Sequence, residues 1–174
     1  MHQVNIIPCG NDQLHTLQDI AINTYGDHYL YLWYDGGMWY IDNSFREETL
    51  KKEIADTNAA FYLIYNADSL VGFLKLNLHK ALEGQASEEE GLELERIYLS
   101  KAAAGRGIGR EVLDFTKRLA LENNKKLIWL KAMDSSSSIG FYEQNGFKKC
   151  GTHTLTYEHM KPEYRGMHVM KLVL

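Results

Sequence analysis

The chain has 174 residues, of which 45% are hydrophobic and 24% charged, a composition typical of one soluble globular domain spanning residues 1–174. Its net charge of −4 argues against nucleic acid as the main partner, because duplex binding needs a basic face. No apolar run approaches the roughly eighteen residues of a membrane span, and the two cysteines, Cys9 and Cys150, are too few for a disulfide framework, so we expect a cytoplasmic protein with no membrane partner.

The N-terminal third predicts one strand and two helices. Residues 3–8 alternate well enough for a strand that ends at its proline. Residues 11–12, Asn and Asp, are typical helix caps, and the apolar spacing after them predicts a helix that stops near Gly26. A Ser-x-x-Glu pattern at 44–47 has the form of a capping box, so a second helix is expected from there to about Asp56.

An unusually aromatic segment, residues 28–43, separates these two helices. It holds several tyrosines and tryptophans around a Gly-Gly pair and two aspartates. One interpretation is an amphipathic element whose rings pack on the core. The other is the wall of a substrate site, because aromatic faces beside carboxylates attract alkylammonium groups by about 0.5–2 kcal/mol per contact. Some rings can pack inward while others face a cleft, and Trp33 and Tyr34 are the substrate-binding candidates.

A hairpin and an acidic loop come next. Residues 59–65 and 70–78 are typical strands, and the Asn-Ala-Asp-Ser sequence between them predicts a turn. The loop 79–91 is rich in glutamate. Such a charge run is usually a solvated connection, and the alternative is long-range attraction for a polycation.

The stretch 92–120 predicts a buried strand, a glycine turn and a helix in immediate succession. Gly105, Gly107 and Gly109 leave the turn without bulky side chains, and apolar residues recur behind them at helical spacing. A helix that starts bare presents free N–H groups and the positive end of its dipole, which predicts an anion site, most often for phosphate. The alternative is a simple connection between strand and helix. The turn is not a P-loop, because Gly-Lys-Ser/Thr is absent, and Arg110 stands at the sixth position of a dinucleotide fingerprint.

The C-terminal part predicts three more strands, at 126–132, 147–156 and 166–174. The first is expected to lie parallel to the strand before the glycine turn, through a right-handed crossover. The seven histidines are scattered and form neither HExxH nor a Cys/His cluster, so no metal is expected. The last strand, His168–Leu174, is a candidate interface for a homodimer.

Two motifs stand in order in the second half of the chain. The first is the spacing AxxGxG of Ala104, Gly107 and Gly109, and the second, within 135–147, is a short helix with a Phe-Tyr pair that ends on Gly-Phe. Together they resemble the pyrophosphate turn and the second cofactor segment of the GNAT superfamily, the acetyl-CoA-dependent N-acetyltransferases. LERIYL, FYLIY, VGFLKLN and NGFKKCGTH are similar to its bacterial spermidine/spermine N-acetyltransferase branch. The chain departs from the family at Ala104, usually Gln or Arg, and at Ser135, usually Asn.

The resemblance implies an α/β (α+β) fold of GNAT type, with a central mixed sheet of about six to seven strands and about four flanking helices. It implies that Tyr142 donates its hydroxyl to the coenzyme sulfur, and that backbone groups hold the pantetheine arm and the diphosphate. It also places the acceptor site beside the aromatic segment. The cofactor-binding residues carried over are Ile97, Tyr98, Leu99, Gly105, Arg106, Gly107, Ile108, Gly109, Arg110, Ser135 and Tyr142.

Acetyl transfer to an amine requires that the amine lose a proton. An alkylammonium has a pKa near 10, so exposing its lone pair at pH 7 costs about 4–5 kcal/mol. A positioned carboxylate can take that proton directly or through a water. Glu95 is the first candidate and Glu93 the second, because both share one face of a strand by its period of two. For each, the alternative is a carboxylate that only forms a salt bridge.

The expected function is therefore acetyl transfer from acetyl-CoA to a primary amine of a small acceptor, by direct attack in a ternary complex and without a metal. Polyamines such as spermidine or spermine are the favoured acceptors. The alternatives are another amine (a protein N-terminus or lysine, an aminoglycoside, an amino acid) or a non-catalytic acetyl-CoA-binding regulator. Because Ala104 and Ser135 depart from the family pattern, the non-catalytic regulator stays an alternative function.

Overall fold

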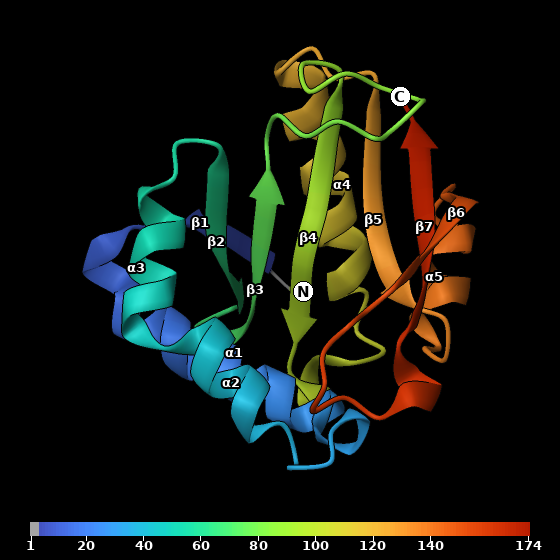
Figure 1. Cartoon of the computed structure of the whole chain (residues 1–174). Coiled ribbons are helices and arrows are strands. Elements are labelled where there is room, and N and C mark those ends of the chain that lie inside the picture. The colour runs from blue at the N-terminus through green and yellow to red at the C-terminus, as the bar shows by residue number, and fades with distance from the viewer. Residues whose placement is uncertain (1–3) are drawn as a thin grey trace.

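The computed structural model describes residues 4–174. Its strands are β1 (Val4–Pro8), β2 (Ala59–Asn66), β3 (Ser69–Asn77), β4 (Gly91–Leu99), β5 (Leu127–Met133), β6 (Lys148–Thr154) and β7 (Gly166–Val173). Its helices are α1 (Leu14–His28), α2 (Met38–Phe45), α3 (Glu47–Ala55), α4 (Ile108–Glu122) and α5 (Ser138–Gln144). One seven-stranded mixed sheet has the order β1-β2-β3-β4-β5-β7-β6 (Figure 1). The predicted mixed α/β fold is confirmed, with five helices in the described residues.

Two apolar layers cover the two faces of the sheet. On one face, α4 and α5 pack their apolar sides on the sheet, with Ile108 and Val112 almost fully buried, as the helical spacing predicts. On the other face, α1, α2 and α3 enclose a second core that is rich in aromatic rings. Figure 1 shows α4 behind the sheet and α1 and α2 across its lower front.

Strands β4 and β5 are paired only where they begin. Their parallel register joins 91–93 to 127–129. Beyond it, within the described chain, β4 is paired with β3 alone and β5 with β7 alone, and Figure 1 shows the two strands spreading apart. The side of β4 that faces β5 therefore presents backbone N–H and C=O groups without sheet partners between Leu94 and Leu99. Such an edge can pair with an extended ligand.

A bulge in β4 changes which of its residues share a face. The pairing with β3 shifts by one residue at Glu95, whose neighbours Leu94 and Arg96 both have partners on β3. Before the shift, even-numbered residues of β4 belong to the layer under α4, and after it Ile97 and Leu99 do. Glu95 and Arg96 consequently project to the same face, the one that α1 and α3 cover.

The predicted capping box at 44–47 is wrong. Ser44 belongs to α2, and α3 begins after Arg46 without a side-chain cap. Arg46 has an extended backbone (φ −65°, ψ 150°), so it ends one helix and starts the next. The expected helix is therefore α3, which starts at Glu47 and ends one residue before Asp56, and α2 is a further helix that begins in the aromatic segment.

Other helix boundaries also differ from the prediction. Residues 11–13 form a 3-10 turn, and α1 then runs past Gly26 to His28 without a side-chain cap at its start. The first strand is described from Val4, and Gln3 of the prediction lies outside the described residues. No helix within residues 4–174 combines the length and the apolar character that crossing a bilayer requires.

The C-terminal strand lies inside the sheet. β7 is paired with β5 on one side and with β6 on the other, so it has no free edge. A homodimer through residues 168–174 could therefore not form by extending the sheet there, and the homodimer stays a prediction.

Candidate active site

Two pockets meet where β4 and β5 separate. The turn pocket, of about 700 Å³, lies beside the glycine turn and α5. The aromatic pocket, of about 250 Å³, lies on the other side of the opening, against α1 and α2. Six residues line both pockets: Tyr29, Ile97, Tyr98, Ser136, Ser138 and Tyr142.

The glycine turn gives α4 a start that is nearly free of side chains. Gly105 (φ 73°) and Gly107 (φ 78°) have left-handed backbones, and Gly107 is the N-cap of α4. A Cβ at either glycine would meet no atom within 4 Å, so the space beside the helix start is open. Arg106 and Arg110 are exposed, whereas the side chain of Ile108 is in the core. Free N–H groups and the helix dipole make this turn fit a phosphate.

A close contact joins the two motifs found in the sequence. A Cβ on Gly109 would lie 3.1 Å from the ring of Phe141, so glycine at this position lets the first turn of α4 approach α5 this closely. The Phe141 ring in turn contacts that of Tyr142, with centroids 5.4 Å apart. The glycine turn and the Phe-Tyr pair therefore form one structural unit.

The end of α1 supports the turn from the other side, and sequence reasoning missed it. The carbonyl of Leu99 lies 2.9 Å from Nε2 of His28, and the backbone N–H of Lys101 donates to Asp27 at 2.8 Å. His28 also lines the turn pocket. No local pattern predicts these bonds, because more than seventy residues separate the partners.

Tyr142 lies at the junction of the two pockets and is 7% exposed. Burial, together with the nearby Tyr29, raises the pKa of its hydroxyl above the ordinary value of 10. The hydroxyl therefore keeps its proton at neutral pH and is a hydrogen-bond donor at the place where the pockets join.

Aromatic rings form the wall of the aromatic pocket. They belong to α1, α2, β4 and the connections that follow α1 and β6: Tyr25, Tyr29, Trp33, Tyr40, Tyr98 and Tyr157. The indole N–H of Trp33 donates to the Tyr25 hydroxyl at 2.7 Å, and the rings of Tyr25 and Tyr40 stack with centroids 4.6 Å apart. The aromatic segment thus packs on the core and borders a cavity at once.

Glu95 lines the aromatic pocket, and both of its carboxylate oxygens are engaged. Nζ of Lys75 lies 2.9 Å from each, Asn77 donates to Oε2 at 2.7 Å, and Nη2 of Arg96 lies 3.4 Å from Oε1. Burial pushes the pKa of Glu95 upward, but the charges of Arg96 and Lys75 outweigh it, so the pKa lies below the ordinary 4.5. Glu95 is therefore ionised at neutral pH.

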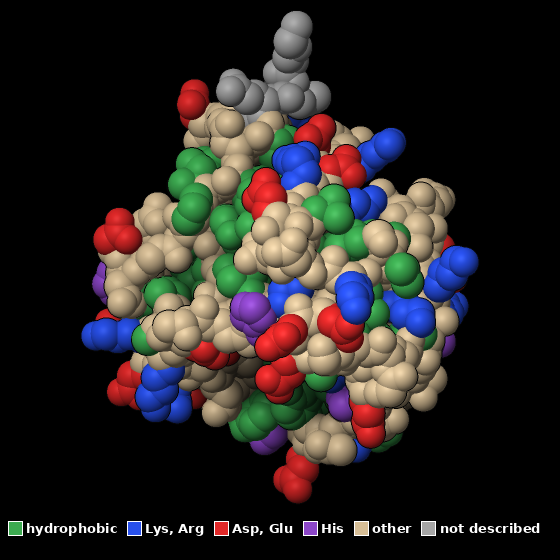
Figure 2. Space-filling model, turned by 90° about the horizontal axis from the view of Figure 1, so that it is seen from above, with side chains coloured by type: hydrophobic (Ala, Val, Ile, Leu, Met, Phe, Trp, Pro, Cys, Tyr) green, Lys and Arg blue, Asp and Glu red, His purple; other side chains and the backbone are tan. Residues whose placement is uncertain are grey.

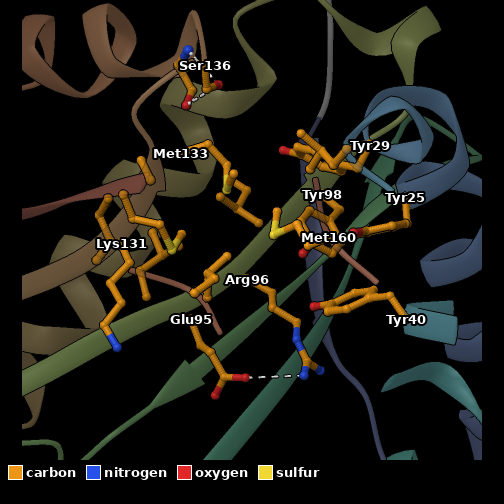
Figure 3. A pocket seen from close by; sticks show the side chains of 18 of the residues that line it. Tyr25, Tyr29, Tyr40, Glu95, Arg96, Tyr98, Lys131, Met133, Ser136 and Met160 are labelled. Atoms are coloured by element: carbon orange, nitrogen blue, oxygen red, sulfur yellow. Dashed lines mark hydrogen bonds and ion pairs between the residues drawn. The ribbon is translucent and has the colours of Figure 1, made fainter. Parts of the chain in front are cut away.

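Arg96 lines the aromatic pocket too and was not singled out from the sequence. Its guanidinium holds the Glu53 carboxylate with two hydrogen bonds, of 2.8 and 3.2 Å. In Figure 3, Glu95 and Arg96 extend to the same side. The sequence does carry a signal for this, since the apolar residues of LELERIYL fall at 92, 94, 97 and 99, a break in alternation that indicates a bulge.

A further cation stands across the opening from Glu95. Lys131 of β5 lines the aromatic pocket and its side chain is exposed (Figure 3). Its Nζ lies 5.8 Å from the centroid of the Trp129 ring. In the part of the chain from 4 to 174, no three His, Cys, Asp or Glu side chains gather as metal ligands.

The structure brings most of the predicted site residues together. Those that line the turn pocket are Ile97, Tyr98, Leu99, Gly105, Gly109, Ser135 and Tyr142. Arg106, Gly107, Ile108 and Arg110 belong to the turn and the start of α4, beside that wall. Glu95 and Trp33 line the aromatic pocket.

Two predicted residues fall outside both pocket walls. Tyr34 is 68% exposed and does not belong to the core cluster that holds Trp33. Glu93 is 8% exposed, and its carboxylate accepts a 2.8 Å hydrogen bond from Asn77. The geometry therefore favours Glu95 over Glu93 and removes Tyr34 from the pocket.

A sheet that opens between two parallel strands beside a bare helix start has the shape and the N–H groups that suit an extended, phosphate-bearing ligand. The profile of the acetyltransferase (GNAT) family matches residues 15–147, and the chain belongs to this family. A curated relative, described as an uncharacterized N-acetyltransferase in the pepI 3′ region of Lactobacillus delbrueckii subsp. lactis, is 29% identical over 115 residues. That alignment covers 66% of this chain and 66% of the relative, so the match spans about two thirds of the relative's length.

Solved structures share the fold over nearly the whole chain. The PaiA N-acetyltransferase of Thermoplasma acidophilum, solved with coenzyme A, has a TM-score of 0.76 and 20% identity, covering 99% of both chains. A variant of the spermidine N-acetyltransferase SpeG of Vibrio cholerae has a TM-score of 0.71 and 17% identity, covering 98% of this chain and 94% of that one. At these identities the likeness shows a common fold.

Proposed function

We propose that this protein transfers the acetyl group of acetyl-CoA to the primary amine of a small acceptor, by direct attack in a ternary complex. The observation that carries the proposal is the shared wall of the two pockets. Ile97, Tyr98 and Tyr142 line both, so a thioester entering from the turn pocket and an amine entering from the aromatic pocket meet there. We treat residues 1–174 as one catalytic domain, because elements from α1 to β7 contribute to this site.

The residues of the turn pocket fit acetyl-CoA. The bare start of α4 suits the diphosphate, with Arg106 or Arg110 near enough in sequence to pair with a phosphate oxygen. The edge of β4 that lacks a strand partner suits the amide groups of the pantetheine arm, through the backbones of Ile97 and Leu99, although the Leu99 carbonyl is already bonded to His28. Ser135 can add a hydrogen bond. When bound, acetyl-CoA supplies the thioester carbon that the amine attacks.

In the reaction, the amine nitrogen bonds to the thioester carbon and the carbon–sulfur bond breaks. A backbone N–H of β4 would stabilise the charge that develops on the carbonyl oxygen. Tyr142 donates a hydrogen bond to the departing sulfur. Because its pKa is raised while a thiol ionises near about 8.5, full proton transfer from the phenol is uphill, and the hydrogen bond is its contribution.

Glu95 acts on the acceptor side. Since it is ionised, it attracts the ammonium form of the acceptor, and the surrounding tyrosine rings add cation–π attraction. As the amine attacks, its proton passes to Glu95 or to a water beside it. A carboxylate with a lowered pKa is a weak base, so we assign Glu95 mainly to binding and orienting the amine.

Polyamines are the acceptor class that we propose, and the cytoplasm is the proposed location. Support for polyamines comes from the aromatic rings with Glu95, and from the common fold with a spermidine N-acetyltransferase. The acidic loop 79–91 gives no support, because Glu90 pairs with Lys126 and Figure 2 shows acidic groups among basic ones at this end. Free Cys9 and Cys150 suit a reducing compartment.

The proposal predicts thiol release from acetyl-CoA in the presence of spermidine. Release is measured in parallel with spermidine, lysine and an aminoglycoside, and kcat/KM for spermidine is expected to be at least about tenfold the others. Faster release with another amine would support the acetyltransferase activity but would overturn polyamines as the acceptor class. Acetyl-CoA binding without release for any amine would favour the non-catalytic regulator.

The predicted homodimer is tested separately, by sedimentation of the same protein.

Lys131→Glu is expected to lower KM for spermidine by about tenfold. A polyamine bound at Glu95 carries further ammonium groups, and the exposed Lys131 across the opening repels them. Propylamine, which has one ammonium, is the matched acceptor and should show a much smaller change. An equal change in KM for both amines would contradict the placement of the distal ammonium near Lys131.

A further inference from the structure

Four charged side chains from three elements form one cluster behind the aromatic pocket. The charge cluster consists of Glu53 on α3, Lys75 on β3, and Glu95 and Arg96 on β4, with two charges of each sign. The β4 bulge creates it, because without the bulge Glu95 and Arg96 would point to opposite faces. Lys75, at 6% exposed, is the most deeply buried member and does not line either pocket.

Lys75 is the link between the two carboxylates. Its Nζ lies 2.9 Å from Glu95 and 3.2 Å from Glu53, whereas Arg96 is committed mainly to Glu53, with its contact to Glu95 at 3.4 Å. Asn77 donates to Oε2 of Glu95, which Lys75 also contacts. The shorter ionic contact of Glu95 is therefore the one made by Lys75.

We propose that Lys75 is a positioning residue of the acetyl-transfer site, whose buried ammonium keeps Glu95 ionised and turned into the aromatic pocket without touching either substrate. The inference rests on the proposed function for its kinetic consequence only. The arrangement itself can be tested on the protein alone, because the ionisation of Glu95 is measurable without any substrate.

The physical reason is the competition between burial and charge at Glu95. Partial burial favours the neutral acid, and the neighbouring cations favour the carboxylate. The charged or titratable groups that face Glu95 are Glu53, Lys75, Glu93, Arg96, Lys131 and Tyr157. If Lys75 is replaced by a neutral residue, Glu95 loses its 2.9 Å ion pair. The cation of the cluster that remains is Arg96, which lies 3.4 Å from Glu95 and is already held by Glu53, so burial and the neighbouring carboxylates should raise the pKa of Glu95.

The first experiment is a titration by NMR. The carboxyl carbon signal of Glu95, assigned by its loss in Glu95→Gln, should have its midpoint below 4.5 in the native protein and above 4.5 in Lys75→Met. Lys75→Arg keeps the charge and should restore the low midpoint. Lys75→Gln, which can still donate to both carboxylates, is prepared in parallel in case the methionine variant does not fold. A midpoint that stays below 4.5 in the neutral variants overturns the proposal.

The second experiment is the pH profile of kcat/KM with spermidine. Lys75→Met should lose about tenfold at one pH unit below the Glu95 midpoint that NMR gives for this variant, and less than about twofold at about pH 9. Lys52→Met, which removes an exposed lysine of α3, is the matched control and should leave the profile unchanged. An equal loss at every pH would show a structural role and overturn the proposal. Absence of turnover in the native protein would instead overturn the proposed function, and the NMR midpoints would still decide the role of Lys75.

Discussion

Tyr142→Phe is expected to lower kcat by about 100-fold while changing the Kd for acetyl-CoA by less than about threefold. The phenyl ring keeps the contacts with Phe141 and Phe147, whose centroids lie 5.4 and 5.7 Å away, so binding and fold are retained. What the variant loses is a buried hydroxyl at the junction of the two pockets. The departing sulfur then lacks its hydrogen-bond donor, which raises the energy of the transition state but not that of bound acetyl-CoA.

The measurement combines isothermal titration of acetyl-CoA with steady-state kinetics. Tyr62→Phe is the matched control, because Tyr62 is a partly buried tyrosine of β2 that packs under α4, against Phe115, and lines neither pocket. It should retain both kcat and Kd. Unchanged kcat in Tyr142→Phe would remove the tyrosine from the chemistry.

Gly107→Glu should raise the Kd for acetyl-CoA by about 100-fold or more. Gly107 has φ 78°, where a Cβ costs about 1–2 kcal/mol, and the new carboxylate would stand at the start of α4, the position proposed for the diphosphate. The fold should survive, since a Cβ there meets no atom within 4 Å. Circular dichroism checks the fold and isothermal titration the binding.

Gly84→Glu is a closely matched control for this variant. Gly84 also has a left-handed backbone, with φ 70°, and open space around its Cβ, but it lies in the loop between β3 and β4. The same strain and the same added charge should leave acetyl-CoA binding unchanged there. If Gly107→Glu still bound acetyl-CoA tightly, the diphosphate would have to lie elsewhere, and the proposed cofactor geometry would be wrong.

Much of the fold was predictable because its signals are local. The strand, the glycine turn and the helix across 92–120 depend on residues close together in sequence, and the structure forms β4, the turn and α4 there. The predicted helix start at 44–47 was wrong because it depends on packing between residues that are distant in the sequence. A capping box is only one of several local options, and the packing of Phe45, which is fully buried, decides for a break at Arg46.

The candidate site also contains some residues that the sequence could predict and others whose role depends on the tertiary structure. The glycines could be found from their spacing and Tyr142 from the family resemblance, and Glu95 was ranked before Glu93 without knowledge of the bulge in β4. A strict period of two predicts one face for both, but it does not show which carboxylate reaches the pocket. The shift in pairing with β3 sets Glu95 against Arg96 and Lys75, and leaves Glu93 beside Asn77.

The amino-acid sequence by itself determined the family, the mixed sheet and the glycine turn before α4, because periodicity, glycine placement and motif order are properties of neighbouring residues. Only the tertiary structure decided the pocket walls, the charge cluster and the support of the turn by α1. These depend on pairs such as Asp27 with Lys101 and Glu53 with Arg96, which are far apart in the chain. Their interaction energies exist only after the sheet has brought them within a few ångströms, so no local pattern can encode them.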